Sequence, residues 1–432
     1  MGITLGVLLA LFIGINAFDE KLDPGAAAIL NAQPKMRAED NAYFYLEGMY
    51  TAASNSPSEA GKKCVLAQLK IARTSTLISD LNNIPECREQ NALKTAADQS
   101  IACDWRQKSC LKQYFEQRVT IKNLAAKNKV VLERYSRLLE FKQFEDTDYL
   151  QQFIVFAKLP PVKLYQATSA TRLQEGDTGG FIRRTQAETR FYRMVLSGES
   201  SVLSKMIGIA WLESSARLVS DAVQASSALG QQNQIALLEI TRPLTVAERS
   251  LEKPLEGEFR FFTSFIRLTP INDFSFLERL LYPLAYKQNA TENYYYHDLT
   301  VWRDISQLPT EQYLDAEKRA LEQLNPWRGG YLHLVYNPMG KILAGIGTTA
   351  YASYPRRIID ADGLLRLVSL QIQIAAQKIP ESDIPAFLKS ADPQFRDPYT
   401  GKPMQWDKTR GLYFRGYSER ITDKEGFVSV KL

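Results

Sequence analysis

The sequence has 432 residues, more than a single hydrophobic core usually contains, so two or three structural regions are expected. Its hydrophobic share of 45% and charged share of 23% are ordinary for a folded globular protein and exclude collagen-like, generally disordered and polytopic membrane proteins. The net charge of +5 is small and basic residues are dispersed, whereas a nucleic-acid binder concentrates them on one element, so we expect no nucleic acid among the partners.

An apolar segment opens the chain. Residues 1–18 contain no charged side chain, and as a helix they would span about 27 Å, just short of the hydrocarbon core of a bilayer. Three of the five residues that follow are acidic, so the downstream flank lacks the positive charge that marks a cytoplasmic side. The pattern predicts a single-pass anchor in a bacterial inner membrane, with the remainder of the chain in the periplasm.

Two alternatives to this anchor stay open. A signal peptide, removed to leave a periplasmic protein, would be cleaved after Ile15-Asn16-Ala17, but Ile departs from the small residue preferred there, and no Lys or Arg precedes the apolar segment. A buried core helix is the other alternative, although such a helix rarely lacks a polar stripe. The uncleaved anchor is favoured over both.

The elements expected between residues 19 and 328 are almost all helical. A spacer at 19–34 precedes an aromatic-rich helix at 40–53 and short helices up to residue 110. In 111–141, Val131, Tyr135 and Leu138 recur at helical steps opposite charged residues, which indicates an amphipathic helix. Further helices are predicted at 185–197, 200–226, 259–268 and 274–286. We divide this part into a Cys-containing helical region at 19–110 and a helical body at 111–328.

The four cysteines are confined to roughly the first quarter of the chain, at Cys64, Cys87, Cys103 and Cys110. An even, clustered set in an exported protein predicts two disulfides, with three connectivities open. A zinc site is the weaker alternative, because structural zinc sites usually contain close C-x-x-C pairs and the tightest pair here is wider. Free buried thiols are the third possibility.

The last hundred residues change character and are predicted to form a small α+β region at 329–432. Two short strands, at 331–336 and 341–344, are expected around a type I turn at Asn337-Pro338-Met339-Gly340. A long apolar helix is predicted from about Gly363 to Gln377. The tail after residue 397 is rich in turns, with strands expected at 404–406 and 412–414.

Motifs that suggest a cofactor are better explained structurally. Residues 345–350 fit the pattern G-x-G-x-x-A, but no series of βαβ units surrounds them, so we predict a glycine bend after a hairpin and no cofactor. Asp360 and Asp362 resemble half of a calcium loop, yet further ligands are missing, and one of them is expected to be an N-cap. No metal site is predicted.

Candidate catalytic residues are equally sparse. Ser200 lacks the second glycine of a nucleophile elbow and is expected to cap a helix. His297 stands in a Tyr-rich surface cluster beside Asp298, and adjacent residues on a helix diverge in direction. His333 is placed in a predicted strand. These residues give no coherent catalytic set.

Several short phrases resemble an uncharacterised group of proteobacterial membrane-anchored proteins: residues 18–22 (FDEKL), 40–45 (DNAYFY), 337–341 (NPMGK) and 397–404 (DPYTGKPM). The last phrase, with Gly411-Leu412-Tyr413 after it, is also similar to the C-terminal β-turn region of type II secretion pseudopilins. The chain lacks the prepilin peptidase site of pseudopilins before its apolar segment. The resemblance therefore implies a compact turn-and-ribbon tail and no secretion role.

We predict a mainly α fold, with a helical bundle-like body and a small α+β C-terminal region, after an N-terminal transmembrane or signal helix. The expected function is a membrane-tethered periplasmic binding or scaffolding protein with a protein partner in the envelope. The alternative is an envelope hydrolase that uses a carboxylate pair on cell-wall glycans, since that chemistry needs two acids and no sequence motif.

Overall fold

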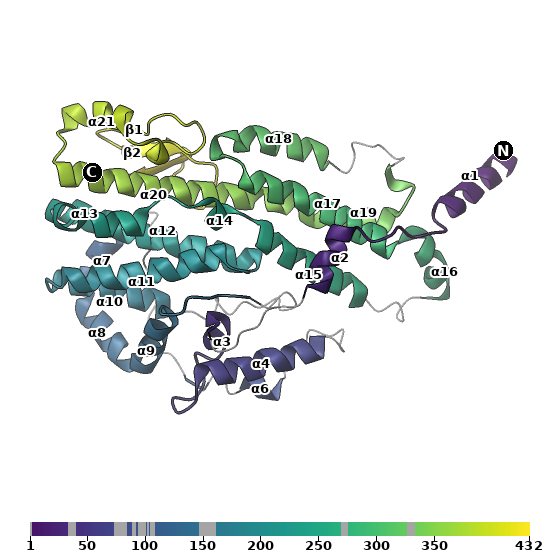
Figure 1. Cartoon of the computed structure of the whole chain (residues 1–432), viewed down its shortest axis with the longest axis horizontal. Helices are drawn as coiled ribbons and strands as arrows, with labels where there is room; N and C mark the ends of the chain where they lie inside the picture. Colours follow the sequence, from purple (N-terminus) through teal and green to yellow (C-terminus); the bar gives the residue numbers. More distant parts are fainter. Residues whose placement is uncertain are drawn as a thin grey trace.

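The computed structural model describes residues 2–32, 40–72, 84–88, 92–93, 101, 103, 109–146, 161–268, 275–325 and 333–432. Most of these residues are helical, and a small antiparallel sheet of three strands lies near the C-terminus (Figure 1). The predicted mainly α fold with a small α+β C-terminal region is confirmed.

The elements follow one another in two halves. The first half contains α1 (Gly2–Ile15), α2 (Pro24–Asn31), α3 (Ala42–Glu47), α4 (Pro57–Ala72), α6 (Pro85–Arg88), α7 (Cys110–Glu116), α8 (Arg118–Lys127), α9 (Lys129–Leu138), α10 (Pro161–Gln174), α11 (Thr178–Ser197) and α12 (Val202–Ala225). The second half contains α13 (Ser227–Thr241), α14 (Val246–Arg249), α15 (Glu252–Leu268), α16 (Phe276–Ala285), α17 (Gln288–Gln307), α18 (Tyr313–Gln323), α19 (Pro338–Thr348), α20 (Ser353–Gln377), α21 (Ile384–Ser390), β1 (Gln405–Asp407), β2 (Gly411–Arg415) and β3 (Phe427–Val430), with short 3-10 turns at Thr310–Gln312, Thr349–Ala352, Glu381–Asp383 and Pro393–Phe395.

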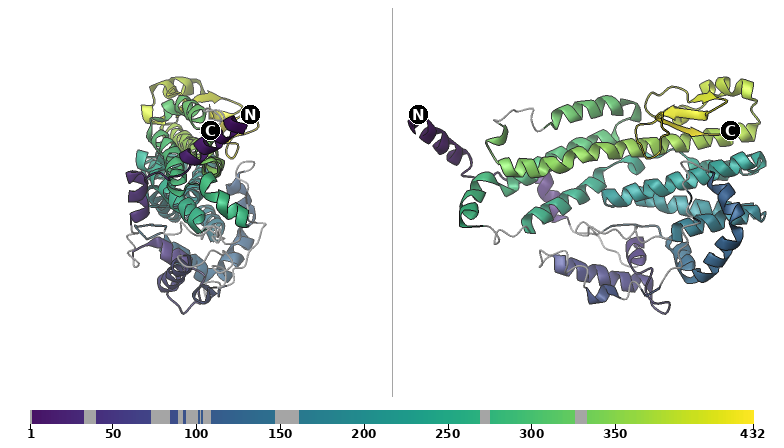
Figure 2. Two further views of the ribbon diagram at one scale, coloured as in Figure 1. Left: turned by 90° about the vertical axis from the view of Figure 1, so that its right-hand side faces the viewer. Right: turned by 180° about the vertical axis from the view of Figure 1, so that it is seen from behind.

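Helix α20 forms the centre of the body. Figures 1 and 2 show it running along the long axis, with α13 and α12 beside it and α11 and α10 beyond them. Leu364, Val368 and Ile372 recur at four-residue steps and are completely buried. A helix that is apolar around most of its circumference is stable only inside a core, and α20 has helices on one side and the C-terminal sheet on the other.

The C-terminal sheet covers the remaining side of α20. Strand β2 pairs antiparallel with β1 and with β3, and the facing pair Phe414 and Val428 is fully buried. A Cβ atom at Gly363 of α20 would lie 2.2 Å from the Phe414 ring, so this close approach requires glycine. The strands predicted at 404–406 and 412–414 are confirmed as β1 and β2, whereas β3 was not predicted.

The predicted hairpin around Asn337–Gly340 is wrong. Its second strand lies within helix α19, His333 lies in a turn, and residues 331–332 are outside the described residues. Asn337 has a φ of 51° and directs its side-chain oxygen to the Lys287 N–H at 2.8 Å. Pro338 then begins the helix, where its missing N–H costs nothing. The residues of the expected type I turn are therefore a helix start, and the glycine pattern after them is helical.

Three further helix predictions need correction. Helix α20 begins at Ser353, ten residues before the expected start. Pro355 lies in its first turn, where proline is tolerated, so it does not interrupt the helix. Asp360 and Asp362 are therefore buried inside this helix and cap nothing. The single helix expected over 111–141 consists of α7, α8 and α9, with non-helical backbone at Gln117 and Asn128. The cap of α12 is Ser201, one residue after the one predicted.

All four cysteines are in disulfides. Cys64 is bonded to Cys87, and Cys103 is bonded to Cys110. The predicted pair of disulfides is confirmed, and of the three possible connectivities the structure has the one that joins neighbours in the sequence. Both bonds fasten short segments to helices, Cys87 of α6 to α4 in one case and Cys103 to the start of α7 in the other.

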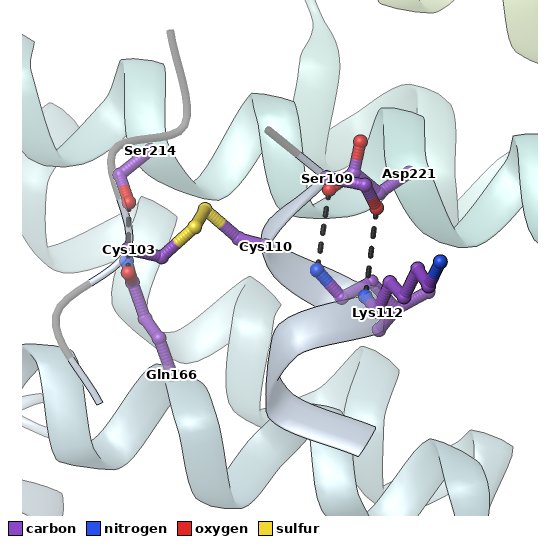
Figure 3. Close-up of a disulfide and its surroundings, with 8 residues drawn as sticks. Cys103, Ser109, Cys110, Lys112, Gln166, Ser214 and Asp221 are labelled. Atoms are coloured by element: carbon purple, nitrogen blue, oxygen red, sulfur yellow. Dashed lines mark hydrogen bonds between the residues drawn. A yellow bond between two sulfur atoms is a disulfide. The ribbon is translucent and has the colours of Figure 1, made fainter. Parts of the chain in front are cut away.

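The second disulfide lies against the bundle. Figure 3 shows the Cys103–Cys110 bond beside Gln166 of α10 and beside Ser214 and Asp221 of α12. Asp221 accepts a hydrogen bond from the Leu111 N–H at 3.3 Å, next to the half-cystine. The disulfide thus ties Cys103 to the start of α7, and α7 is in turn hydrogen-bonded to α12.

Candidate functional site

Helix α1 projects from one end of the body, far from the C-terminal sheet at the other end (Figures 1 and 2). The exposed fractions are 54% for Val7, 56% for Leu11 and 43% for Ile13. At 3.6 residues per turn, Val7 and Leu11 share one side of the helix and Ile13 lies on another. Apolar side chains are therefore exposed on more than one side of α1, and none of its residues is charged.

The length of α1 differs from expectation. The helix has 14 residues and ends at Ile15, whereas the apolar segment extends to residue 18. Within the part of the chain that the structure describes, no helix combines the length and the hydropathy needed to cross a membrane.

A set of hydrogen bonds fastens the end of α1 to the body. The Asn16 side chain is completely buried, donates to the Val335 carbonyl at 2.8 Å and accepts the Asn337 N–H at 3.1 Å. The partners lie about 320 residues along the chain, directly before α19. Asn16 is one of two polar residues of the apolar segment, with Thr4, and its contacts make it the first tie between α1 and the body.

Two acidic residues continue this attachment. Asp19 accepts the backbone N–H groups of Asn289 and Ala290 at 2.9 and 3.0 Å, which places its charge at the N-terminus of α17. Glu20 accepts the Asn293 side-chain N–H at 3.0 Å, and Asn293 in turn accepts the Asp23 N–H at 2.7 Å. We name Asn16, Asp19, Glu20, Asn293 and Asn337 the polar joint.

Helix α19 begins at this joint and turns an apolar face outward. Its exposed side chains are Met339, Ile342, Leu343 and Ile346, with exposed fractions of 42%, 56%, 40% and 71%. These residues are spaced i, i+3, i+4 and i+7, so they lie along one side of the helix. We name them the α19 stripe. The spacing is present in the sequence, but the expected hairpin rested on the turn preference of Asn337–Gly340 alone.

The opposite face of α19 is built for close packing on α17. Ala344 is completely buried, and a Cβ atom at Gly340 would lie 1.9 Å from the Thr291 hydroxyl. Small residues therefore seat the helix, and the large apolar ones are left outside. This arrangement is the reverse of an ordinary surface helix, whose apolar face meets the core.

Apolar and aromatic side chains of α16 lie at the same end of the molecule. Leu281 is 51% exposed, and the neighbouring ring of Tyr282 lies 5.0 Å from that of Tyr286. Helix α16 contacts α19. Tyr336 adds an aromatic side chain at the joint itself, donating to the Phe18 carbonyl at 3.3 Å.

The histidines considered in the sequence lie in this half of the body but form no acid–base pair with each other. The His297 ring is exposed, with Nε2 3.7 Å from the Asp23 carboxylate. The His333 ring lies 5.8 Å from the Tyr294 ring, and burial together with the Lys341 charge lowers the pKa of His333. His297 belongs to α17 and His333 lies beside Tyr294 of the same helix, so both rings are part of one aromatic cluster.

Two buried carboxyl groups lie inside the bundle. Glu188 accepts hydrogen bonds from Tyr135 at 3.1 Å and Gln166 at 3.0 Å, and burial raises the pKa of Glu188 to about 7. Burial also raises the pKa of Glu213 to about 7, against the opposing charge of Arg420 at 3.5 Å. Neither lines the small pocket beside Arg249, and no carboxyl group is among the side chains that line that pocket.

The two aspartates of the half calcium loop serve to hold elements together. Asp360 accepts hydrogen bonds from the Tyr399 hydroxyl at 2.7 Å and the Ser418 N–H at 2.6 Å, which fastens the tail to α20. Asp362 accepts from the Arg366 guanidinium and, at 2.6 Å, from the Leu244 N–H. Their donors come from segments up to 118 residues away, which no local pattern reveals.

Comparison with known proteins adds no relative. No protein-family model, no curated protein and no solved structure matches this chain, so its function has to be inferred from the arrangement of its own residues.

Proposed function

We propose that this protein is tethered to a bacterial inner membrane by α1 and that its helical body stands on the periplasmic side as a binding scaffold for an envelope protein. The observation that carries the proposal is the exposure of apolar side chains on more than one side of α1. A helix that is apolar all round belongs in a protein core or in lipid, and α1 projects away from the core (Figure 1).

The disulfides support the compartment. Two disulfides are typical of an oxidising space such as the periplasm and are rare in the cytosol. The polar joint supports the uncleaved form, because cleavage after Ala17 would remove Asn16 and its two bonds to the body. The long core around α20 gives the body a fixed shape, which suits a protein that holds a partner.

The tether can be tested with reporters fused after Leu432 in the full-length chain. Alkaline phosphatase, active only where disulfides form, should be active, and a cytoplasmic reporter at the same position should be silent. The chain should also stay in the membrane pellet after alkaline carbonate washing. A soluble chain with cytoplasmic reporter activity would overturn the proposal.

A pair of variants separates anchoring from general surface polarity. Val7→Asp with Leu11→Asp places two charges on the exposed side of α1 and should release the chain from the pellet, because each charge in a bilayer costs about 3 kcal/mol. Val119→Asp with Ile235→Asp alters two exposed apolar residues of the body, 67% and 87% exposed, and should leave the chain in the membrane. Cross-linking of the wild-type chain in intact membranes, followed by identification of the linked proteins, would then name the partner.

A further inference from the structure

We infer that the α19 stripe is a second membrane contact, lying in the interfacial layer of the same bilayer that holds α1. The inference rests on the proposed function and deepens it, because it names the part of the body that touches lipid. The stripe is Met339, Ile342, Leu343 and Ile346, all between 40% and 71% exposed.

The first argument is the orientation of α19. The helix seats itself through Gly340 and Ala344, so its small residues face α17 and its large apolar residues face outward. Scattered exposed apolar residues are normal on a protein surface, but four at i, i+3, i+4 and i+7 form a continuous face. Such a face is the one with which an amphipathic helix enters the boundary between lipid headgroups and acyl chains.

The second argument is position. Asn16, at the end of α1, is bonded to Asn337, and the stripe begins two residues later with Met339. The foot of α1 and the start of α19 therefore share one attachment point. A bilayer that contains α1 lies beside α19, and Figure 1 shows α16, with its exposed Leu281, at the same end of the body.

The third argument selects lipid over a second protein. Because Val7, Leu11 and Ile13 are exposed on different sides of α1, a single protein groove covers only part of that helix, whereas lipid surrounds it. Tyr336 lies at the joint and Tyr282 belongs to α16, which contacts α19, and tyrosine is the type of residue that gathers at the level of lipid headgroups.

Charge at the joint is compatible with a headgroup layer. The Asp19 carboxylate accepts backbone N–H groups at the start of α17, and the Glu20 carboxylate accepts the side-chain N–H of Asn293 in the same helix. Lys341 lies on the side of α19 turned away from the stripe, and its ammonium group donates to the His333 carbonyl at 2.7 Å and lies 5.9 Å from the centre of the Tyr336 ring. These three charged groups therefore each have a polar partner at or near the joint.

The experiment uses single fluorescent labels on the full-length chain in vesicles of equal parts phosphatidylcholine and phosphatidylglycerol. No cysteine in the structure is free, so an introduced thiol can be labelled selectively. Ile346→Cys labels the stripe, Val7→Cys labels α1 as the reference inside lipid, and Ile235→Cys labels an exposed apolar position of the body, 87% exposed. Each label is quenched in turn by spin-labelled lipid and by aqueous iodide.

The inference predicts that lipid quenches the label at 346 at least twofold more than the label at 235, with the reverse order for iodide. If 346 behaves like 235 while the vesicles still float with the protein and quench the label at 7, the stripe is not a lipid contact and the tether stands. If the label at 346 is shielded from both quenchers and cross-links to another chain, a second copy covers the stripe, and the inference is overturned. A chain that does not float with the vesicles overturns the tether and this inference together. Met339→Cys, on the same stripe, repeats the test should Ile346→Cys fail to fold.

Discussion

Glu213 is an ionisable side chain held deep in the bundle with little to stabilise its charge. Both carboxylate oxygens are buried and lack a hydrogen-bond partner, and the nearby Arg420 nitrogen is 3.5 Å away. Burial raises the pKa of Glu213 from 4.5 to about 7. The folded state therefore binds more protons than the unfolded state between these two pH values, and the free energy of unfolding falls as the pH rises through that window.

Glu213→Gln should remove this dependence. Glutamine keeps the shape without the charge, so the variant should match the wild type near pH 4 and exceed its free energy of unfolding by roughly 1 to 3 kcal/mol near pH 8. Urea unfolding of both chains at the two pH values measures the difference. Glu133→Gln, at a side chain that is 61% exposed, should show no such change with pH. A constant difference between the wild type and Glu213→Gln across pH would show that Glu213 does not titrate in this window.

Asp360 is the residue that fastens the tail to α20. Asp360→Ala would leave the N–H groups of Tyr417 and Ser418 without this acceptor, and it would leave the Tyr399 hydroxyl only the Arg356 carbonyl, 3.3 Å away. We expect the free energy of unfolding to fall by about 2 to 4 kcal/mol, because each unsatisfied donor costs about 1 kcal/mol or more. Tyr399→Phe removes one donor and should cost about 1 kcal/mol. Equal losses for the two variants in urea unfolding would contradict this role.

Residue roles of this kind were the least predictable from the sequence. One of Asp360 and Asp362 was expected to be the N-cap of a helix, because a local pattern shows the aspartates and the glycine but not the tail that returns to them. Asn16 was considered only as part of a possible cleavage site. Its partners at Val335 and Asn337 are separated from it by more than 300 residues. The disulfides were predictable, because four clustered cysteines in a segment that is expected to be exported have few other uses.

At the scale of elements, α19 depends on two glycines with opposite surroundings. A Cβ atom at Gly340 would lie 1.9 Å from the Thr291 hydroxyl and 2.4 Å from the Asn337 side chain, whereas one at Gly345 meets nothing within 4 Å. Gly340→Ala should therefore lower the free energy of unfolding by about 1 to 3 kcal/mol through overpacking.

Gly345→Ala should raise the free energy of unfolding by up to about 1 kcal/mol, because alanine restricts the unfolded chain and favours helix. Thermal and urea unfolding of the two variants measure the contrast. Destabilisation by both changes would mean that α19 is not seated on α17 through Gly340.

Elements were predictable where one signal dominated. Helix α12 and strands β1 and β2 follow from periodicity and turn residues, and they appear close to the expected positions. At α19 two signals conflicted: the turn preference of residues 337–340 pointed to a hairpin, and the spacing of Met339, Ile342 and Ile346 pointed to a helix. Contacts with α17 decide the conflict in favour of the helix. The early start of α20 was missed because the apolar pattern is clear only after Gly363, while Pro355 lies in the first turn of the helix.

At the scale of the whole molecule, the polar joint controls how α1 moves relative to the body. Asn16→Ala with Asp19→Ala removes the buried amide and the carboxylate that caps α17. A fluorophore attached at Val7→Cys in membranes should then show lower steady-state anisotropy, because helix and body no longer turn as one. Asp315→Ala, an exposed acid of α18, is the control and should leave the anisotropy unchanged. Equal anisotropy in all three chains would mean that the joint does not restrain α1.

The joint also decides what the body can reach. A domain on a flexible linker explores a volume around its anchor and meets partners at many heights and angles. In the proposed tether, hydrogen bonds fasten the end of α1 to the body within a few residues, so the far end with the C-terminal sheet would keep a fixed distance and direction from the membrane (Figure 2). A force applied to the sheet would be transmitted through the polar joint to α1. A small tilt of α1 would in turn produce a larger displacement of the sheet at the opposite end of the body.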